Sequence, residues 1–300
     1  GGFCTGKVLQ NRHTPDPHSF IGEGKANEVR MLVEATASTM VIFDNELSPG
    51  NIRALEEIIG VTVLDRSALI LDIFAQRAKT KEGRLPVELA QHKHLLPRLS
   101  GMGRNLSRQG GGIGTRGPGE TKLESDKRHI RRRIKSLEEE FEALEKRRSL
   151  ARARREKDGV ETVVIVGYTN AGKSTLMNAL TQAGVLAENK LFATLDPTSR
   201  GLTLPDGREV MLIDTVGLIR RLPHKLVEAF KSTLEVAAEA TVILNVCDAS
   251  DVHANEHLEV TKRLLNELGC QGKPVISVMN KCDLVGDIYS MPTFGKTVMI

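Results

Sequence analysis

The chain has 300 residues, of which 40% are hydrophobic and 27% are charged, and its formal net charge is +4. This length suits about two domains, each with its own core. No apolar run approaches the ~20 residues of a membrane-spanning helix, and no secretory signal opens the chain. With four scattered cysteines that lack metal-ligand spacing, these features favour a cytoplasmic protein without a membrane span.

Charge is distributed unevenly along the chain. Residues 101–157 contain 17 basic and 9 acidic side chains, whereas residues 1–100 are balanced and residues 158–300 are acidic overall. A neutral start, a basic middle and an acidic end predict three functional parts. The basic middle part is where we expect a polyanion to bind.

The first part, residues 1–66, alternates between helix and strand patterns. Helices over about 24–37 and 49–59 are each followed by a short apolar strand, at 40–44 and 61–65. Such alternation predicts a small N-terminal parallel α/β domain.

The second part, residues 67–158, is predicted to form an antiparallel, coiled-coil-like helical hairpin with a glycine-rich tip loop at 101–121. Pro86 suits the first residue of the hairpin's first helix, and Pro97 is expected to kink or end that helix. In the second helix, apolar residues recur at alternating spacings of four and three, as in a coiled-coil seam. These residues are Ile130, Ile134, Leu137, Phe141, Leu144 and Ala151.

The second helix is expected to begin at a capping box in which Thr121 is the N-cap and Glu124 follows three residues later. Its charges come in blocks, and the glycine loop before it carries arginines. A solvated structural hairpin explains some of this charge, but its segregation favours an arm that binds RNA. The candidate RNA-contacting residues are Arg104, Arg108, Arg116, Lys122, Lys127, Arg128, Arg131 and Arg132.

The third part, residues 159–300, opens with a nucleotide-binding motif. A β-branched apolar run at 163–166 precedes glycine, four residues, glycine, lysine and serine. In this pattern backbone N–H groups face a polyphosphate, Lys173 reaches the outer phosphates, and the hydroxyl of Ser174 binds Mg²⁺. The motif consists of Gly167, Tyr168, Thr169, Asn170, Ala171, Gly172, Lys173 and Ser174.

Two later segments supply the other parts that a GTPase needs near the phosphates. Thr194 can complete the coordination of Mg²⁺, with Thr198 as the alternative. Asp214 would hold Mg²⁺ through water, and the N–H of Gly217 would sense the γ-phosphate. The segments consist of Phe192, Ala193, Thr194, Leu195 and Asp196, and of Asp214, Thr215, Val216 and Gly217.

A base-reading motif follows the apolar run at 275–278. It consists of Asn280, Lys281, Cys282 and Asp283. The carboxylate of Asp283 would accept hydrogen bonds from N1–H and the 2-amino group of guanine. Adenine lacks both donors, so discrimination should amount to several kcal/mol. The sequence therefore predicts a protein that binds GTP and its product GDP.

These motifs are those of the P-loop GTPase superfamily, and several segments resemble the HflX family of ribosome-associated GTPases. Three of them lie in the GTPase part, at 167–174, 191–198 and 214–220. Two more, at 110–121 and 71–77, lie outside it. The resemblance therefore covers nearly the whole chain.

The resemblance implies an N-terminal α/β domain, a helical hairpin and a GTPase domain in a monomeric factor. It also implies binding to the large ribosomal subunit and its RNA, and the splitting of stalled or idle ribosomes. A GTP-regulated ribosome-assembly factor and an RNA-remodelling protein are the alternatives. The family's first strand and the Ser-Ala loop behind guanine are not found. We therefore expect a sequence truncated at both ends, with weakened affinity for guanine and for the ribosome.

The resemblance also bears on hydrolysis, for which Lys173, Thr194, Gly217 and Leu218 form the expected catalytic set. Leu218 stands where Ras-like GTPases carry the glutamine that orients water, so we expect slow hydrolysis that ribosomal particles stimulate. Asn170 resembles a residue that coordinates K⁺ in some GTPases, where the ion replaces an arginine finger. A turn-stabilising role for Asn170 is the alternative.

Overall fold

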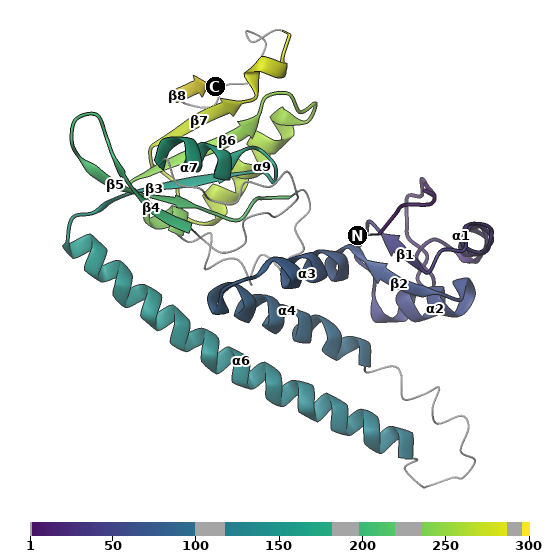
Figure 1. Ribbon diagram of the computed structural model, residues 1–300. Helices are drawn as coiled ribbons and strands as arrows, with labels where there is room; N and C mark the ends of the chain where they lie inside the picture. The colour runs from purple at the N-terminus through teal and green to yellow at the C-terminus, as the bar shows by residue number, and fades with distance from the viewer. Residues whose placement is uncertain (1, 100–117, 182–197, 220–235, 287–295) are drawn as a thin grey trace. The chain divides into compact units, whose positions relative to one another are not determined.

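The computed structural model describes residues 2–99, 118–181, 198–219, 236–286 and 296–300 (Figure 1). The chain forms two compact units. One combines Gly1–Asp72 with Leu89–Leu137, and the other combines Ile73–Glu88 with Glu138–Ile300. Since both long helices of the middle part contribute to each unit, the three-domain division remains a prediction.

The first unit contains the small parallel α/β arrangement that the sequence predicts. Helix α1 (Glu23–Thr36) leads to β1 (Met40–Phe43), and α2 (Pro49–Ile59) leads to β2 (Thr62–Asp65). The two strands pair in parallel, with Met40 opposite Thr62. Apolar side chains of both helices and of β2 form one core, which includes Ala26, Val29, Val33, Ile52, Leu55, Ile59 and Val63.

Helix α2 shows how local sequence sets an element's ends. The Ser48 side chain accepts a hydrogen bond from the N–H of Asn51, and the Asn51 side chain accepts one from the N–H of Ser48. Pro49 follows as the first helical residue, where its missing N–H is not needed. Gly60 ends the helix in the left-handed conformation, which glycine adopts without strain.

A buried carboxylate joins the strand end of the first unit to the helical segment. Asp65 is 1% exposed. Its Oδ1 lies 2.9 Å from Nη2 of Arg98 and 3.5 Å from Nε2 of His94, and both of these residues are on α4 (Lys81–Leu99). Burial by itself would raise the pKa of Asp65, but His94, the Ala68 N–H and Arg98 together lower it to about 2. Asp65 therefore stays ionised and holds α4 at neutral pH.

The hairpin's first helix does not begin where the sequence predicts. After α3 (Arg66–Arg77), helix α4 begins at Lys81 instead of Pro86, and the hydroxyl of Thr80 caps it by accepting from the N–H of Gly83 at 3.1 Å. The helix continues past Pro97 to Leu99, so it does not end at this proline, and a kink there stays a prediction.

The second helix of the hairpin, α6 (Pro118–Lys157), spans 40 residues and thus about 60 Å. It begins before Thr121, so the predicted N-cap at that residue is wrong. Leu137 in the expected seam is fully buried, whereas Ala151 is exposed. Within the second unit, Lys81 pairs with Glu140 and Glu82 with Arg148. The start of α4 therefore lies beside the C-terminal half of α6, as the predicted antiparallel arrangement requires.

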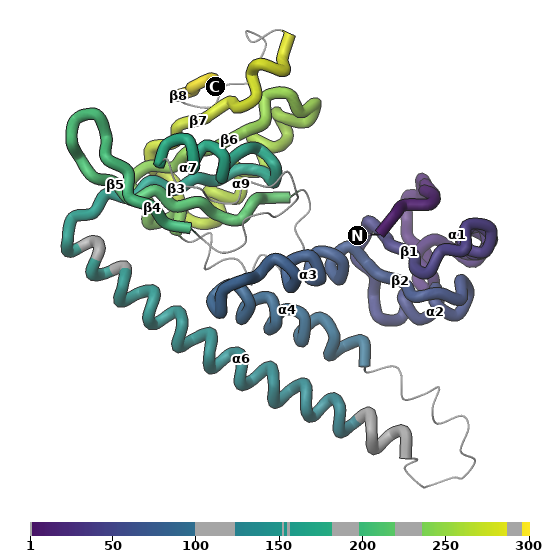
Figure 2. The backbone as a smooth tube through the Cα atoms, viewed as in Figure 1, coloured from purple at the N-terminus to yellow at the C-terminus, as the bar shows by residue number. Residues whose placement is uncertain are grey.

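The second unit contains a six-stranded sheet with the order β4-β5-β3-β6-β7-β8, which can be followed in Figure 2. Its strands are β3 (Glu161–Gly167), β4 (Thr198–Thr203), β5 (Glu209–Asp214), β6 (Val242–Asp248), β7 (Val275–Asn280) and β8 (Lys296–Met299). Strand β4 is antiparallel to β5, and the other neighbours are parallel.

Two helices cover opposite faces of this sheet. Helix α7 (Lys173–Thr181) places Met177 in a core with Ile165 and Leu212. Helix α9 (Ala254–Glu267) places Leu265 in a second core with Val164 and Ile243. The α/β architecture that the sequence predicts is confirmed, and the strand ends next to α7 form the candidate site.

The described ranges contain no helix that combines the length and the apolarity needed to cross a membrane. All four cysteines have free thiols, with Cys4 exposed and Cys247, Cys270 and Cys282 buried. Burial raises the pKa of the Cys247 thiol to about 11, so this thiol stays protonated.

Candidate nucleotide-binding site

The phosphate loop joins the end of β3 to the start of α7, as the motif predicts. Two of its glycines have positive φ, 144° at Gly167 and 96° at Gly172. A Cβ added to Gly167 would lie 2.1 Å from the carbonyl oxygen of Val246, and one added to Gly172 would lie 2.0 Å from Nδ2 of Asn280. Both positions therefore require glycine, because the loop passes directly against neighbouring strand ends.

We expect the substitution Gly172→Ala to weaken GTP binding by at least about tenfold. The added methyl group would strain a left-handed residue and displace the side chain of Asn280. Equilibrium titration with a fluorescent GTP analogue measures the effect. Gly24→Ala in α1 is the matched control, because nothing lies within 4 Å of its added Cβ. Equal affinities of the two variants would contradict the prediction.

Lys173 is buried at the first position of α7. Its side chain is 6% exposed, and Nζ donates to the carbonyl oxygen of Tyr168 at 2.7 Å. Burial lowers the pKa of Lys173 to about 8, against the opposing effect of the Asp214 charge. An ammonium group that has lost its hydration in this way is strongly stabilised by an incoming phosphate anion.

Two of the side chains expected to bind Mg²⁺ are in direct contact, one at the start of α7 and the other at the end of β5. The hydroxyl of Ser174 donates to Oδ2 of Asp214 at 2.6 Å, and Asp214 is fully buried at the end of β5. A hydroxyl next to a carboxylate is the hard oxygen environment that Mg²⁺ prefers, so these residues fit the ion. Thr198 lies opposite Asp214 in the β4–β5 register. Thr194 lies outside the described residues, as do Phe192, Ala193, Leu195 and Asp196.

The segment after β5 lies directly against the phosphate loop. The N–H of Leu218 donates to the carbonyl oxygen of Gly167 at 3.0 Å, and the N–H of Thr169 donates to that of Leu218 at 2.8 Å. Gly217 packs so closely that its added Cβ would lie 2.7 Å from the Thr169 side chain. Thr215 and Val216 are buried, as is Leu218 at 5% exposure. The structure therefore brings this predicted segment and the phosphate loop together.

The base-reading motif forms a turn at the end of β7. Asn280 donates from Nδ2 to the carbonyl oxygen of Ala171 at 2.8 Å, which connects this turn to the phosphate loop. Lys281 adopts a left-handed conformation with φ of 63°, and Cys282 is buried. Asp283 is exposed, so its carboxylate is accessible to a base.

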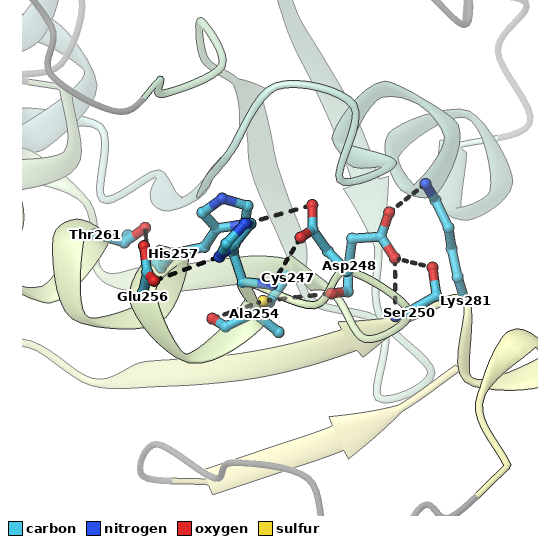
Figure 3. A network of polar contacts seen from close by, with 10 residues as sticks. Cys247, Asp248, Ser250, Ala254, Glu256, His257, Thr261 and Lys281 are labelled. Carbon is cyan, nitrogen blue, oxygen red and sulfur yellow. Dashed lines mark hydrogen bonds and ion pairs between the residues drawn. The ribbon is translucent and has the colours of Figure 1, made fainter. Parts of the chain in front are cut away.

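Sequence reasoning missed two contacts at this site. The ring of Tyr168 stacks on that of His257, with ring centroids 3.7 Å apart and an interplanar angle of 19°. Asp248 forms an ion pair with Lys281 (Figure 3). Neither His257 nor Asp248 belongs to a sequence motif. Both contacts depend on which elements lie side by side in the fold, so no pattern along the chain indicated them.

The fold and the site define a P-loop nucleotide-binding protein of the GTPase class. Three family models match the chain: GTP-binding GTPase N-terminal at residues 1–75, GTP-binding GTPase Middle Region at 77–155, and 50S ribosome-binding GTPase at 162–281.

Two curated relatives and a solved structure are similar to this chain. GTPase HflX of Caldanaerobacter subterraneus subsp. tengcongensis is 55% identical, over 95% of this chain and 67% of its own length. GTPase HflX of Alkalihalophilus pseudofirmus is 48% identical, over 100% of this chain and 70% of its own length. A crystal structure of a GTP-binding protein from Sulfolobus solfataricus in complex with GDP is 27% identical, with a TM-score of 0.48, and the match covers 93% of this chain and 75% of that one.

The chain belongs to the HflX family of GTPases, and it spans about two thirds of the length of the relatives it matches. Its membership confirms the resemblance seen in the sequence and the GTP-hydrolysing activity expected from it.

Proposed function

We propose that this GTPase binds the large ribosomal subunit in a nucleotide-dependent manner and splits stalled or idle ribosomes. The observation that carries the proposal is the combination, in one chain, of a domain that matches the 50S ribosome-binding GTPase model with a long helix that bears a basic block. Ribosomal RNA is the polyanion that such a helix would meet on a ribosome.

The basic block on α6 supports contact with RNA phosphates. Arg128, Arg131 and Arg132 are exposed, and their spacings of three and four residues place Arg128 near each of the others on the helix surface. Lys127 is half-buried. Arg104, Arg108 and Arg116 lie outside the described residues, as does the side chain of Lys122, so their contacts remain predictions.

We assign roles in the GTP site on the geometry described above. Lys173 would bind the outer phosphates, Ser174 would bind Mg²⁺ directly, Asp214 would hold the ion through water, and Asp283 would read guanine. Thr194, which lies outside the described residues, is the further ligand predicted from the sequence. Mg²⁺ supplies positive charge that neutralises the phosphates. The Gly217 N–H binds the γ-phosphate, so hydrolysis changes the bonding of the segment that contacts the phosphate loop.

Leu218 gives a direct test of how hydrolysis is controlled. Its buried side chain has no polar atom that orients water, so we expect low basal activity. Leu218→Gln should change the basal or the ribosome-stimulated rate of GTP hydrolysis, measured as phosphate release under single-turnover conditions. Leu180→Gln on α7, where the leucine is 41% exposed, is the control. Unchanged basal and stimulated rates in the Leu218 variant would exclude this role.

Asn170 gives a test of a monovalent cation. It has a left-handed backbone with φ of 64° inside the phosphate loop. If its side chain helps to bind K⁺, hydrolysis should be several-fold faster in K⁺ than in Na⁺ at constant ionic strength, because the ion adds positive charge near the transition state. Asn170→Ala should abolish the difference. Equal rates in the two salts would leave the turn-stabilising role.

The ribosome proposal is tested by cosedimentation with purified large subunits in a non-hydrolysable GTP analogue, in GDP and without nucleotide. We expect binding that requires the GTP analogue and falls steeply with salt. Arg128→Glu combined with Arg131→Glu should weaken binding, whereas Lys7→Glu with Arg30→Glu makes the same charge change elsewhere. Absence of binding in every nucleotide state would contradict the proposal.

Splitting is tested separately by sucrose-gradient analysis of intact ribosomes after incubation with the protein and GTP. An increase in free subunits supports splitting. Binding to precursor particles without dissociation of intact ribosomes would instead identify a GTP-regulated assembly factor.

A further inference from the structure

Asp248 lies beside the base-reading turn although no sequence motif includes it. It is the last residue of β6, and it pairs with Asn280 of β7 in the parallel register. The N–H of the next residue, Ala249, donates to the carbonyl oxygen of Asn280 at 2.8 Å. The loop that follows β6 is therefore attached to the residue at which the base-reading turn begins.

Both carboxylate oxygens of Asp248 are engaged (Figure 3). Oδ2 accepts from the ammonium group of Lys281, while Oδ1 accepts from the N–H of Ser250 at 3.0 Å and from its hydroxyl at 2.6 Å. The side chains of Lys281 and Asp248 are 29% and 17% exposed. A pair that is this far removed from water interacts more strongly than a surface pair.

The protonation state of Asp248 is compatible with this pairing at neutral pH. Burial by itself raises the pKa of Asp248, but the hydrogen bonds from Lys281 and Ser250 lower it below its ordinary value. The carboxylate therefore remains charged and keeps its attraction for the ammonium group.

Lys281 has a backbone conformation that needs support. Its left-handed φ of 63° costs a residue with a Cβ about 1 kcal/mol or more. The turn is held by the N–H of Lys281, which donates to Oδ1 of Asn280 at 2.9 Å, and by the N–H of Leu284, which donates to the Lys281 carbonyl oxygen at 3.1 Å. Asp248 adds a third point of attachment, at the end of the side chain.

We propose that Asp248 is a positioning residue for guanine recognition, which acts through Lys281 and holds the turn that presents Asp283 to the base. The inference rests on the proposed guanine site, since Asp283 is two residues beyond Lys281. Without the carboxylate, the ammonium group of Lys281 moves toward water, and the turn loses its attachment to the loop after β6.

The substitution Asp248→Asn tests this role, because it removes the charge and preserves the size of the side chain. We expect a fluorescent GDP analogue to dissociate about tenfold faster, the preference for GTP over ATP to fall by a similar factor, and kcat at saturating GTP to stay within about twofold. Asp206→Asn is the matched control: it makes the same change at an aspartate that is paired with a basic side chain, Arg208, and that accepts from a backbone N–H, but in the turn between β4 and β5. Unchanged dissociation in the Asp248 variant, or a reduced kcat with unchanged KM, would overturn the inference.

A double-mutant cycle tests whether Asp248 acts through Lys281. Lys281→Met should accelerate dissociation, and adding Asp248→Asn to it should have little further effect, because the pair is already broken. Additive effects would overturn the proposed route. Ser250→Ala keeps the charge and removes one hydrogen bond, so it should accelerate dissociation by about twofold even if Asp248→Asn does not fold. No acceleration in the Ser250 variant would then count against the inference.

Asp283→Asn in the same assay distinguishes failure of the positioning role from failure of the guanine site. Loss of guanine preference in this variant, with wild-type behaviour of Asp248→Asn, would reject the positioning role and leave the guanine site in place. Unchanged preference in Asp283→Asn would reject the guanine site itself.

Discussion

Replacing Asp283 with asparagine is expected to change the base preference from guanine to xanthine. The carboxylate offers two acceptors to the N1–H and 2-amino donors of guanine, whereas an asparagine amide offers one acceptor and one donor. The amide donor would face the 2-amino group of guanine without a partner. In xanthine a carbonyl oxygen replaces this amino group and accepts from the amide.

We expect a loss of GTP affinity of about 100-fold, since a donor that the bound base covers and leaves unpaired costs about 1–3 kcal/mol and one charged hydrogen bond is also lost. XTP should bind at least about tenfold better than GTP. Competition of GTP, XTP and ATP against a fluorescent nucleotide measures all three affinities.

The structure indicates that this change affects recognition and not folding. Asp283 is exposed, so the thermal midpoint of the unliganded protein should stay close to that of the wild type. Asp126→Asn, an exposed change on α6, is the control and should leave base preference unaltered. A variant that keeps its preference for GTP over XTP would show that Asp283 does not read the base.

Replacing Lys173 with methionine is expected to have opposite effects on binding and on stability. The ammonium group contacts the phosphates in the proposed site, so GTP binding and hydrolysis should fall by at least about 100-fold. The unliganded protein should become more stable by about 1–2 kcal/mol at pH 7. A lowering of the pKa from 10.5 to about 8 corresponds to a cost of about 3 kcal/mol, from which the lost hydrogen bond to Tyr168 subtracts about 1.

The sign of the pH dependence follows from the direction of this shift. The pKa of Lys173 is lower in the folded state, so between about pH 8 and pH 10.5 the unfolded chain binds more protons. The cost of burying the charge is complete below pH 8 and is lost as the pH rises through this window. The advantage of the methionine variant should therefore shrink as the pH increases.

Denaturant unfolding of both proteins without nucleotide, at pH 7 and at pH 9.5, measures this difference. Leu176→Met in the same helix controls for a methionine at a partly buried position. A Lys173→Met variant that is less stable than the wild type at pH 7 would show that the ammonium group does not destabilise the unliganded fold.

The nucleotide-binding elements could be predicted from the sequence because their requirements are local. Glycine at positions 167 and 172 is needed where the loop has positive φ, and a β-branched run at 163–166 suits a strand covered on both faces. The short strands at residues 40 and 62 were also correctly placed by their alternation with helices. These features depend on residues within a few positions of one another.

The ends of the two long helices could not be predicted in this way. Pro86 suits a first helical position, yet Leu85 and Val87 on either side of it are buried, and the burial of these two side chains within the helix outweighs the preference of one proline. The threonine at position 80 carried a usable N-cap signal, which the proline obscured. Helix α6 begins at Pro118, so the capping pattern at Thr121 does not set its first residue.

The sequence by itself determined the class of protein, the phosphate loop, the turn motif at 280–283 for which we propose guanine recognition, and the basic block of α6. Tertiary structure decided which distant residues meet: Asn280 reaches the carbonyl oxygen of Ala171, 109 residues away, and Asp248 reaches Lys281. The physical reason is that parallel pairing brings the carboxyl ends of strands far apart in the chain to one edge of the sheet. A pattern read along the chain contains no such distance.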